Sequence, residues 1–457
     1  MFRTLVVLIA AALASQGGEL LASSAKRKIT PAIQEGSPVW MAGFGQGRAA
    51  TGVHDELWVR CLAMSTGGRP VAICAADLIG LFWDDVAKVR EGVKAKLGKD
   101  ADVIVASTHV HEGPDTMGLW GPKMGVSGID DAYNAFVVTS AVDAAAEAIA
   151  TLRPATLRAV KVTPGDAAGY YDDSRPPVVH DPEIVALAVD GMDRQRIATL
   201  VNWSNHPEAL GSQNTLLSSD WPAGLYARLE QLEGGTVVFV NGAVGGMQSP
   251  LGAKIIDPKT KQPAPKDSFR FAEVVGEYVA DHIHAGWGET RTALNIDEIV
   301  YRESMVKIPV TNAGFEMAAQ ANLYKGRKAV LADKTNTSPV GYLRLSAAGK
   351  TLVEVALIPG ELYPELSAGG VVADDPGADF PGAPVEPAIK KLMTAPYRML
   401  FGLANDEIGY IIPKAQWDEK PPYTFGAQRR WYGEVNSVGP DAAPEIARAM
   451  QALTQQR

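Results

Sequence analysis

The sequence predicts a mixed α/β fold (α+β) in one large catalytic domain, with its active site at the C-terminal ends of strands. Three observations predict it. Segments with apolar residues at helical spacing alternate with short runs rich in β-branched residues. No compositional linker splits the chain into two halves. Polar residues that could bind a metal or transfer a proton follow several of the apolar runs.

The composition is that of a globular protein with a large core. The chain has 457 residues, of which 46% are hydrophobic and 21% charged. Its net charge is -9, and the lysines and arginines are dispersed, so a nucleic-acid partner is not expected. After the N-terminus no stretch reaches the roughly 20 apolar residues that span a bilayer. We therefore expect no stable membrane span, and at most peripheral membrane contact.

The N-terminus has the pattern of a secretory signal peptide. Arg3 precedes an apolar run over residues 5–11, and Ala12-Leu13-Ala14 is a small-x-small cleavage signal. We expect the signal to occupy residues 1–14, with the cleavage point uncertain up to about residue 25. The main domain is then expected over residues 28–457. The mature protein would be periplasmic or secreted.

The only two cysteines, Cys61 and Cys74, flank the turn "STGGRP". Strands over residues 57–64 and 71–76 would form a hairpin that places the two cysteines opposite each other on one face. An oxidising compartment would allow a disulfide. Two buried thiols are the other interpretation, and the sequence leaves both open.

The remaining elements follow from hydrophobic periodicity. Strands are predicted over residues 101–108, 197–204, 235–242, 351–360 and 407–413. Helices are predicted over residues 84–98, 131–152, 268–285, 313–332 and 443–455. The Gly- and Pro-containing segments 251–268 and 367–387 are predicted to be long loops.

Residues with chemical function follow five of these strands. The run "VIVAST" leads into the H-x-H motif, and the other four lead into the segments "SNHPE", "GGMQSP", "IPGE" and "GYIIP". Three imidazoles and a carboxylate match the ligand types that zinc prefers. Zinc with such ligands keeps a position for water and lowers the pKa of that water to about 7, as amide or ester hydrolysis requires. The residues concerned are His109, His111, His206, Ser249, Glu361 and Tyr410.

Several of these segments together resemble the neutral/alkaline non-lysosomal ceramidase family. "HVHEGPDT" is similar to the family's H-T-H-S-G-P-G-G, and "NWSNHPEALGSQNTLLSSDWPAGL" to its second histidine region. "KITP", "GGMQSP", "IPGE", "GYIIP" and "WYGE" are similar to further family segments and occur in the family's order. The resemblance runs from about residue 28 to the end of the chain, without the C-terminal β-sandwich domain of the larger members.

The resemblance implies one Zn²⁺ per chain. The ligands that it implies are His109, His206, Glu361 and Tyr410. His111 would lie beside the metal as a proton-transfer group, and Ser249 would occupy the position of the family's active-site serine. Arg175 and Tyr432 would bind or polarise the substrate. Other interpretations stay open: Arg175 as a surface ion pair, Tyr410 as a core aromatic and Ser249 as a turn residue before Pro250.

The function that follows is an exported zinc hydrolase that cleaves an N-acyl amide bond with metal-activated water. Glu112 stands where the family has serine, and this departure argues against ceramide, which is a sphingolipid, as the substrate. The expected substrate is therefore ceramide or, equally, a smaller N-acyl amide. An esterase or lactonase of the same fold is an alternative. A binding protein for lipids or sugars, without catalysis, is another. The oligomeric state is left open.

Overall fold

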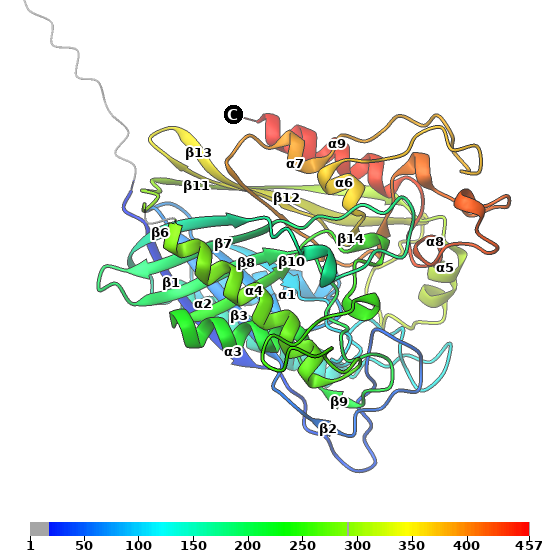
Figure 1. Cartoon of the computed structure of the whole chain (residues 1–457), viewed down its shortest axis with the longest axis horizontal. Coiled ribbons are helices and arrows are strands. Elements are labelled where there is room, and N and C mark those ends of the chain that lie inside the picture. The colour runs from blue at the N-terminus through cyan, green and yellow to red at the C-terminus, as the bar shows by residue number, and fades with distance from the viewer. Residues whose placement is uncertain (1–17, 290–291, 457) are drawn as a thin grey trace, which may run out of the picture.

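The centre of the fold is an eight-stranded sheet (Figure 1). The computed structural model describes residues 18–289 and 292–456. The order of strands across the sheet is β10-β8-β7-β6-β1-β3-β4-β5. Their bounds in chain order are β1 Leu21–Lys28, β3 Trp58–Ser65, β4 Val71–Ala76, β5 Asp102–Ser107, β6 Arg153–Val162, β7 Ile184–Gly191, β8 Arg196–Trp203 and β10 Thr236–Asn241.

The sheet is mixed and strongly curled. β4 pairs with β5 and β8 with β10 in parallel, whereas the other neighbours are antiparallel. β10, at one edge, also lies beside β4 and β5 at the other edge. This curl brings the C-terminal ends of β5, β8 and β10 close together.

A second sheet packs face to face on the first. It contains β11 Glu298–Pro309, β12 Thr335–Ala347, β13 Lys350–Leu357 and β15 Tyr397–Phe401 in that order, with β13 and β15 parallel. Apolar side chains of both sheets form one buried cluster, including Leu62 and Leu200 from the first sheet and Leu343 and Met399 from the second. The inner core of the molecule therefore lies between the sheets.

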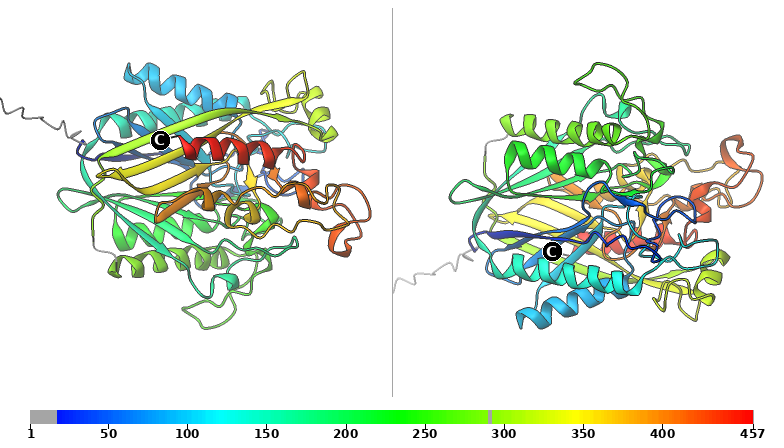
Figure 2. Two further views of the ribbon diagram at one scale, coloured as in Figure 1. Left: turned by 90° about the horizontal axis from the view of Figure 1, so that it is seen from above. Right: turned by 90° about the horizontal axis from the view of Figure 1, so that it is seen from below.

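Helices cover the outer faces of both sheets (Figure 2). α1 (Trp83–Leu97) and α2 (Asp131–Ala150) pack on β1, β3, β4 and β5, and α3 (Trp221–Glu233) and α4 (Phe269–Glu289) pack on the other half of that sheet. α7 (Ile389–Leu392) and α9 (Ala442–Gln455) cover the second sheet. The result is a four-layer arrangement of helices, sheet, sheet and helices.

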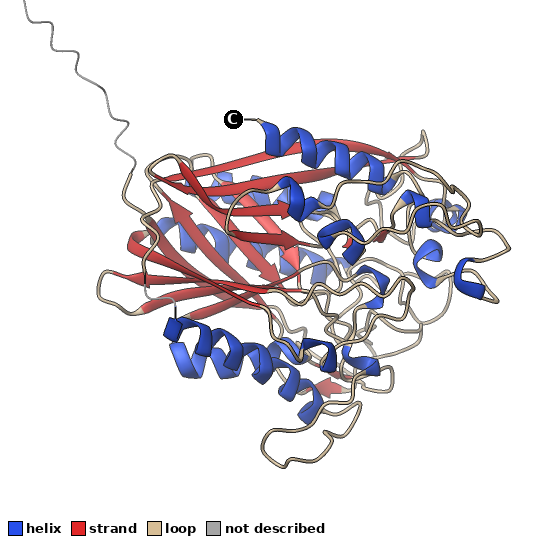
Figure 3. Ribbon diagram, turned by 45° about the horizontal axis from the view of Figure 1, so that its top comes forward, coloured by secondary structure: helices blue, strands red, loops and turns tan. Residues whose placement is uncertain are grey.

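Loops and short elements gather at one end of the sheets (Figure 3). Two short parallel pairs lie among them: β2 (Gly52–Val53) with β9 (Leu216–Leu217), and β14 (Glu361–Leu362) with β16 (Tyr410–Ile411). The short helices are α5 Ala313–Gln320, α6 Pro364–Ala368 and α8 Tyr432–Val435, with 3-10 turns at Ala167–Gly169, Gly245–Met247, Pro250–Gly252, Lys414–Gln416 and Thr424–Gly426.

The structure confirms the predicted fold class and most predicted elements. The hairpin is β3 and β4, its register pairs Cys61 with Cys74, and the two cysteines form a disulfide. The predicted helix over 313–332 is wrong in length, since α5 ends at Gln320 and left-handed backbone follows at Asn322 and Lys325. The predicted strand over 407–413 is reduced to the two residues of β16.

β1 begins seven residues before the expected domain boundary at residue 28, and it pairs along its whole length with β3. The predicted signal peptide, residues 1–14, lies outside the described residues. Among residues 18–289 and 292–456, no helix combines the length and the apolar character that crossing a membrane requires.

Candidate metal centre

The segment after β5 carries two of the candidate residues. The backbone N–H groups of Thr108 and His109 donate to the carbonyls of Ala76 and Leu78, at 2.8 and 2.9 Å. His109 has φ of 70°, in the left-handed region that non-glycine residues seldom occupy. Such strain costs about 1–3 kcal/mol and clusters at functional sites. His111 follows two residues later, and the centroids of the two imidazole rings lie 5.0 Å apart.

The segment after β8 brings His206 to the same place. Asn241, the last residue of β10, donates from its side-chain amide to the carbonyls of Thr108 and Asn205, at 3.1 and 3.0 Å. The backbone N–H of His111 donates to the carbonyl of Pro207 at 3.0 Å. These buried hydrogen bonds hold the two histidine segments against each other.

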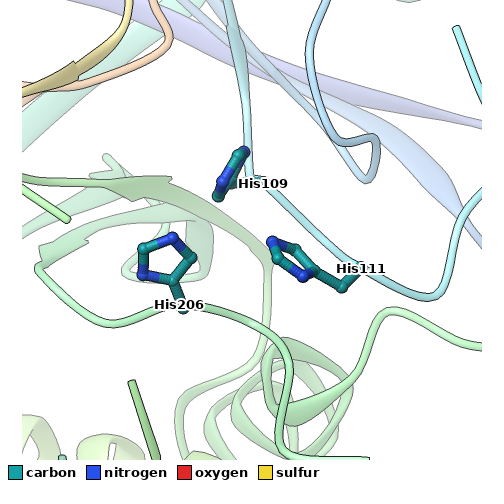
Figure 4. Close-up of side chains that lie close together, drawn as sticks. All are labelled: His109, His111 and His206. Atoms are coloured by element: carbon teal, nitrogen blue, oxygen red, sulfur yellow. The ribbon is translucent and has the colours of Figure 1, made fainter. Parts of the chain in front are cut away.

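The three histidines form a buried cluster that could hold a metal ion. Each offers one ring nitrogen, and the three nitrogens lie within 4.8 Å of one another. Figure 4 shows the rings of His109, His111 and His206 around a common space. A carboxylate joins them, because Oε2 of Glu361 lies 3.3 Å from Nε2 of His109 and 3.0 Å from Nε2 of His206.

Backbone carbonyls orient two of the imidazoles. Nδ1 of His109 lies 2.7 Å from the carbonyl of Ile79, and Nδ1 of His206 lies 2.8 Å from the carbonyl of Gln248. A carbonyl oxygen only accepts, so both Nδ1 atoms carry the hydrogen in the neutral rings and both Nε2 atoms keep a lone pair. Ligating histidines are held in this way in metal sites.

The electrostatics of the centre favour a negative carboxylate among imidazoles. Burial would raise the pKa of Glu361, but the charges and hydrogen bonds of His109 and His206 outweigh it and lower the pKa. Burial and the neighbouring imidazoles lower the pKa of His111 well below its ordinary value. For His206, burial opposes the charged form, yet Glu361 and Glu208 raise its pKa to about 8.

Two predicted tyrosines lie next to this group. Tyr410 pairs with Glu361 in the register of β14 and β16, so these residues are direct neighbours across two strands. The Tyr410 hydroxyl donates to Sδ of Met247 at 3.0 Å. Burial, with the charge of Glu361, raises the pKa of Tyr410 well above its ordinary value, which keeps it a neutral hydroxyl. Tyr432 begins α8, and its ring centroid lies 5.8 Å from that of Tyr410.

A narrow cavity of about 70 Å³ opens beside the cluster. One end is polar, with His109, His111, Glu361, Glu407, Tyr410 and Tyr432 in its lining. The walls are mainly apolar and aromatic, with Ile79, Phe82, Met117, Leu119, Trp120, Phe315 and Tyr324. The cavity therefore suits a small polar group attached to an apolar chain.

Arg175 does not line this cavity. Its guanidinium is buried and forms a two-pronged ion pair with Glu434, at 2.8 and 3.0 Å. It also donates to the Tyr363 hydroxyl at 3.0 Å and to the carbonyl of Gln416 at 2.8 Å. The interpretation of Arg175 as a surface ion pair is wrong about exposure, because only 3% of the residue is accessible. Its predicted substrate contact stays a prediction.

Ser249 is also absent from the lining of the cavity. Its hydroxyl accepts from the backbone N–H of Leu251 at 3.1 Å and so caps the 3-10 turn Pro250–Gly252. Its backbone pairs with Asp172. This contact matches the turn-residue interpretation, and a part for Ser249 in catalysis stays a prediction.

The contacts of three carboxylates near the centre could not be predicted from the sequence. Glu112 points away from the imidazoles, since it pairs with Arg48 at 3.1 Å and accepts from the Asn214 amide at 2.9 Å. Glu407 lines the cavity, and burial, with the charge of Glu361, raises its pKa well above the ordinary value. Glu208 contacts His111. One sequence feature could have indicated Glu208, because it stands two residues after His206.

These features define a class of protein: a four-layer α/β fold with an imidazole and carboxylate centre, able to hold a metal ion, where the strands end. Comparison with solved structures then gives a more particular result. A neutral ceramidase from Pseudomonas aeruginosa matches with a TM-score of 0.71 and 16% identity, over 96% of this chain and 75% of that chain. A structure titled ceramidase complexed with C2 matches with a TM-score of 0.70 and 15% identity, over 95% and 75%.

No protein-family model and no curated protein sequence matches this chain. The predicted resemblance to the ceramidases is confirmed at the level of the fold, which this chain shares along almost its whole length. At such low identity the match supports a shared arrangement of the chain and no particular chemistry.

Proposed function

We propose that this chain is an exported, zinc-dependent hydrolase of the ceramidase type that cleaves an N-acyl amide bond. The observation that carries the proposal is the convergence of His109, His206 and Glu361 beside an apolar cavity, whose lining includes His109 and Glu361. Its fold, shared with two solved ceramidases, supports the same reaction class.

The donor set fits zinc. Two neutral imidazoles and one carboxylate are the protein ligands of many catalytic zinc sites. Donors about 2.0 Å from a tetrahedral ion are about 3.3 Å apart, and the contacts of Glu361 with His109 and His206 are 3.3 and 3.0 Å. When bound, zinc would polarise the amide carbonyl and supply hydroxide at neutral pH. Tyr410 is proposed to complete the ligand set.

The remaining polar groups would orient the amide and move protons. His111 lines the cavity beside the cluster, where its imidazole can take a proton and pass it to the leaving amine. Tyr410 and Tyr432 line the same cavity, and their hydroxyls would donate to the amide oxygen as negative charge develops there. Arg175, held by Glu434, would support the segment that carries Tyr432.

The apolar walls favour an acyl chain over a peptide or sugar. Phe82, Trp120 and Phe315 among others give the cavity large hydrophobic contact area. An amide group of an N-acyl substrate would reach the imidazoles while its chain lies along these walls. Ceramide and smaller N-acyl amides share this chemistry. Export is supported by the Cys61–Cys74 disulfide, because such bonds persist in oxidising compartments.

The test is hydrolysis by the full chain of matched substrates that carry one acyl group as an amide, an ester or a lactone. We expect amide cleavage that stops on removal of metal with a chelator and returns with zinc. Glu361→Gln should lower kcat by about a hundredfold or more, because it removes a charged ligand. His284→Ala, at an exposed histidine of α4, is the control and should keep full activity.

Cleavage of the ester or lactone alone would replace the amidase assignment with the esterase alternative. Binding of the acyl compounds without turnover would support the non-catalytic alternative. Activity that is unaffected by chelation and by Glu361→Gln would contradict a metal-dependent reaction.

A further inference from the structure

We propose that Glu208 is a positioning residue for His111: its carboxylate accepts the Nδ1 hydrogen of that imidazole and directs Nε2 into the centre. The proposal rests on the proposed function only for its catalytic consequence. The contact itself, and the tautomer that it selects, belong to the protein without metal or substrate.

The contact joins two buried side chains. Nδ1 of His111 lies 3.2 Å from Oε2 of Glu208, and the two residues are 6% and 1% exposed. The alignment falls short of a full hydrogen bond, and neither ring nitrogen of His111 has a hydrogen-bond partner within the described part of the chain. Hydrogen bonds at active sites often tighten only when the complex forms.

In the described part of the chain, no hydrogen bond accounts for the position of the Glu208 side chain. Within residues 18–289 and 292–456 no group hydrogen-bonds to its side chain, and its Oε1 is buried without a partner. A buried carboxylate without partners is costly, so its position needs a reason. The imidazole of His111 is the polar group that it contacts.

The backbone around Glu208 is built to hold it there. Asp220 accepts from the backbone N–H groups of Ala209 and Leu210, each at 3.0 Å. The indole of Trp221 donates to the carbonyl of His206 at 2.9 Å. The turn that orients His206 therefore also fixes Glu208, two residues further on.

The ring of His111 is confined from the other side as well. A Cβ on Gly43 would lie 2.3 Å from Cγ of His111, and Gly43 has φ of 97°, so a side chain is excluded twice at this position. Arg48 donates to the carbonyl of His111 while it pairs with Glu112. Backbone and ring are thus held independently, and Glu208 decides which nitrogen carries the hydrogen.

The carbonyls of Ile79 and Gln248 accept from Nδ1 of His109 and His206 and fix the tautomers of these rings in the same way. In His111 a carboxylate takes the place of the carbonyl. His111 therefore differs from its two neighbours in the chemistry of the group that faces its Nδ1.

The experiment is nitrogen-15 NMR of the full chain, metal-free and zinc-loaded, with labelled histidine, where His111→Gln assigns the resonance. Wild type should show His111 protonated at Nδ1. Glu208→Gln keeps an acceptor and should keep that tautomer, whereas Glu208→Met, of similar size without an oxygen, should lose it. Glu365→Gln is the control, since Glu365 is equally buried with one unpartnered oxygen, in α6.

Activity gives the second measurement. Glu208→Met should lower kcat for the amide about 10- to 100-fold with little change in KM, and Glu208→Gln should recover most of the loss. If Glu208→Met does not fold, Glu208→Ala replaces it. Protonation of His111 at Nε2 in wild type, or at Nδ1 in both Glu208→Met and wild type, would overturn the proposal. A wild type without amidase activity would sink the proposed function and leave the NMR result standing.

Discussion

His109 shows how one residue can carry both strain and function. Its φ of 70° turns the chain directly after β5 and brings His109 and His111 to the same cavity. The nearest hydrogen bonds that hold this turn come from the backbone, at Leu78 and Ile79. The spacing H-x-H indicated a pair of imidazoles, but no sequence pattern revealed the left-handed backbone that joins them.

Of the two acidic residues that follow candidate histidines, Glu208 contacts an imidazole, whereas Glu112 pairs with Arg48. Glu112, next to His111, was the departure that argued against ceramide as substrate. In the structure it is neutralised by Arg48 and turned away from the centre. Glu208 instead contacts the imidazole of His111. Glu112 therefore gives no reason of its own against ceramide.

The hydroxyl of Ser249 leads to a prediction that separates a structural from a catalytic role. Because its hydroxyl caps a 3-10 turn, Ser249→Ala should lower the free energy of unfolding by about 1 kcal/mol. The kcat for the amide substrate should stay within about threefold of wild type, whereas loss of a nucleophilic serine costs about a millionfold. Steady-state kinetics and urea denaturation of the variant measure the two effects. A drop of kcat by several orders of magnitude would contradict this expectation and support the catalytic role that the resemblance implies for Ser249.

Helices and strands with a clear local hydrophobic pattern lie where the sequence predicted them. The helices α1, α2, α4 and α9 and the strands β3, β4, β5, β8 and β10 all lie where periodicity indicated. β1 was missed because its sequence, "LASSAKRK", is half polar, and only pairing with β3 and β6 makes it a strand. The predicted helix after residue 313 was too long because Ala-rich sequence continues past Gln320, while the backbone turns left-handed.

Asp77 connects the ends of several elements near the site. Its buried carboxylate accepts from the backbone N–H of Trp58 and from the hydroxyls of Thr108, Ser219 and Tyr226, at 2.9 to 3.4 Å. Burial raises its pKa to about 6, although the charge of Arg60 and these hydrogen bonds oppose the change. A carboxyl group whose pKa is higher in the folded than in the unfolded state keeps its proton over a pH range in which the unfolded chain has already released it.

The consequence is a testable pH dependence of stability. The contribution of Asp77 is fully present below about pH 4 and is lost as the pH rises through about 6, and it amounts to on the order of 3 kcal/mol. Asp77→Asn keeps one acceptor, and the hydroxyls can turn to accept from its amide. The difference in unfolding free energy, variant minus wild type, should therefore rise by about 3 kcal/mol between about pH 4 and 7. Urea denaturation of both proteins across this range measures it, and a constant difference would contradict it.

At the scale of the whole molecule, curl and layering create the site. Residues separated by more than 250 positions, His109 and Glu361, come into contact because the first sheet curls and the second packs on its inner face. Sequence motifs placed His109, His206 and Glu361 at the ends of predicted strands, and the structure brings these three side chains into contact. The sequence could not reveal which of those residues touch, since that depends on the register of distant strands.

The central claim is that this fold holds a zinc ion at the histidine cluster, and the metal content of the purified full chain tests it most directly. We predict about one zinc per chain in wild type and in His284→Ala, and a large loss in His206→Ala. Elemental analysis after dialysis gives the ratio. Wild type that contains no metal and takes up none when zinc is supplied would contradict the account.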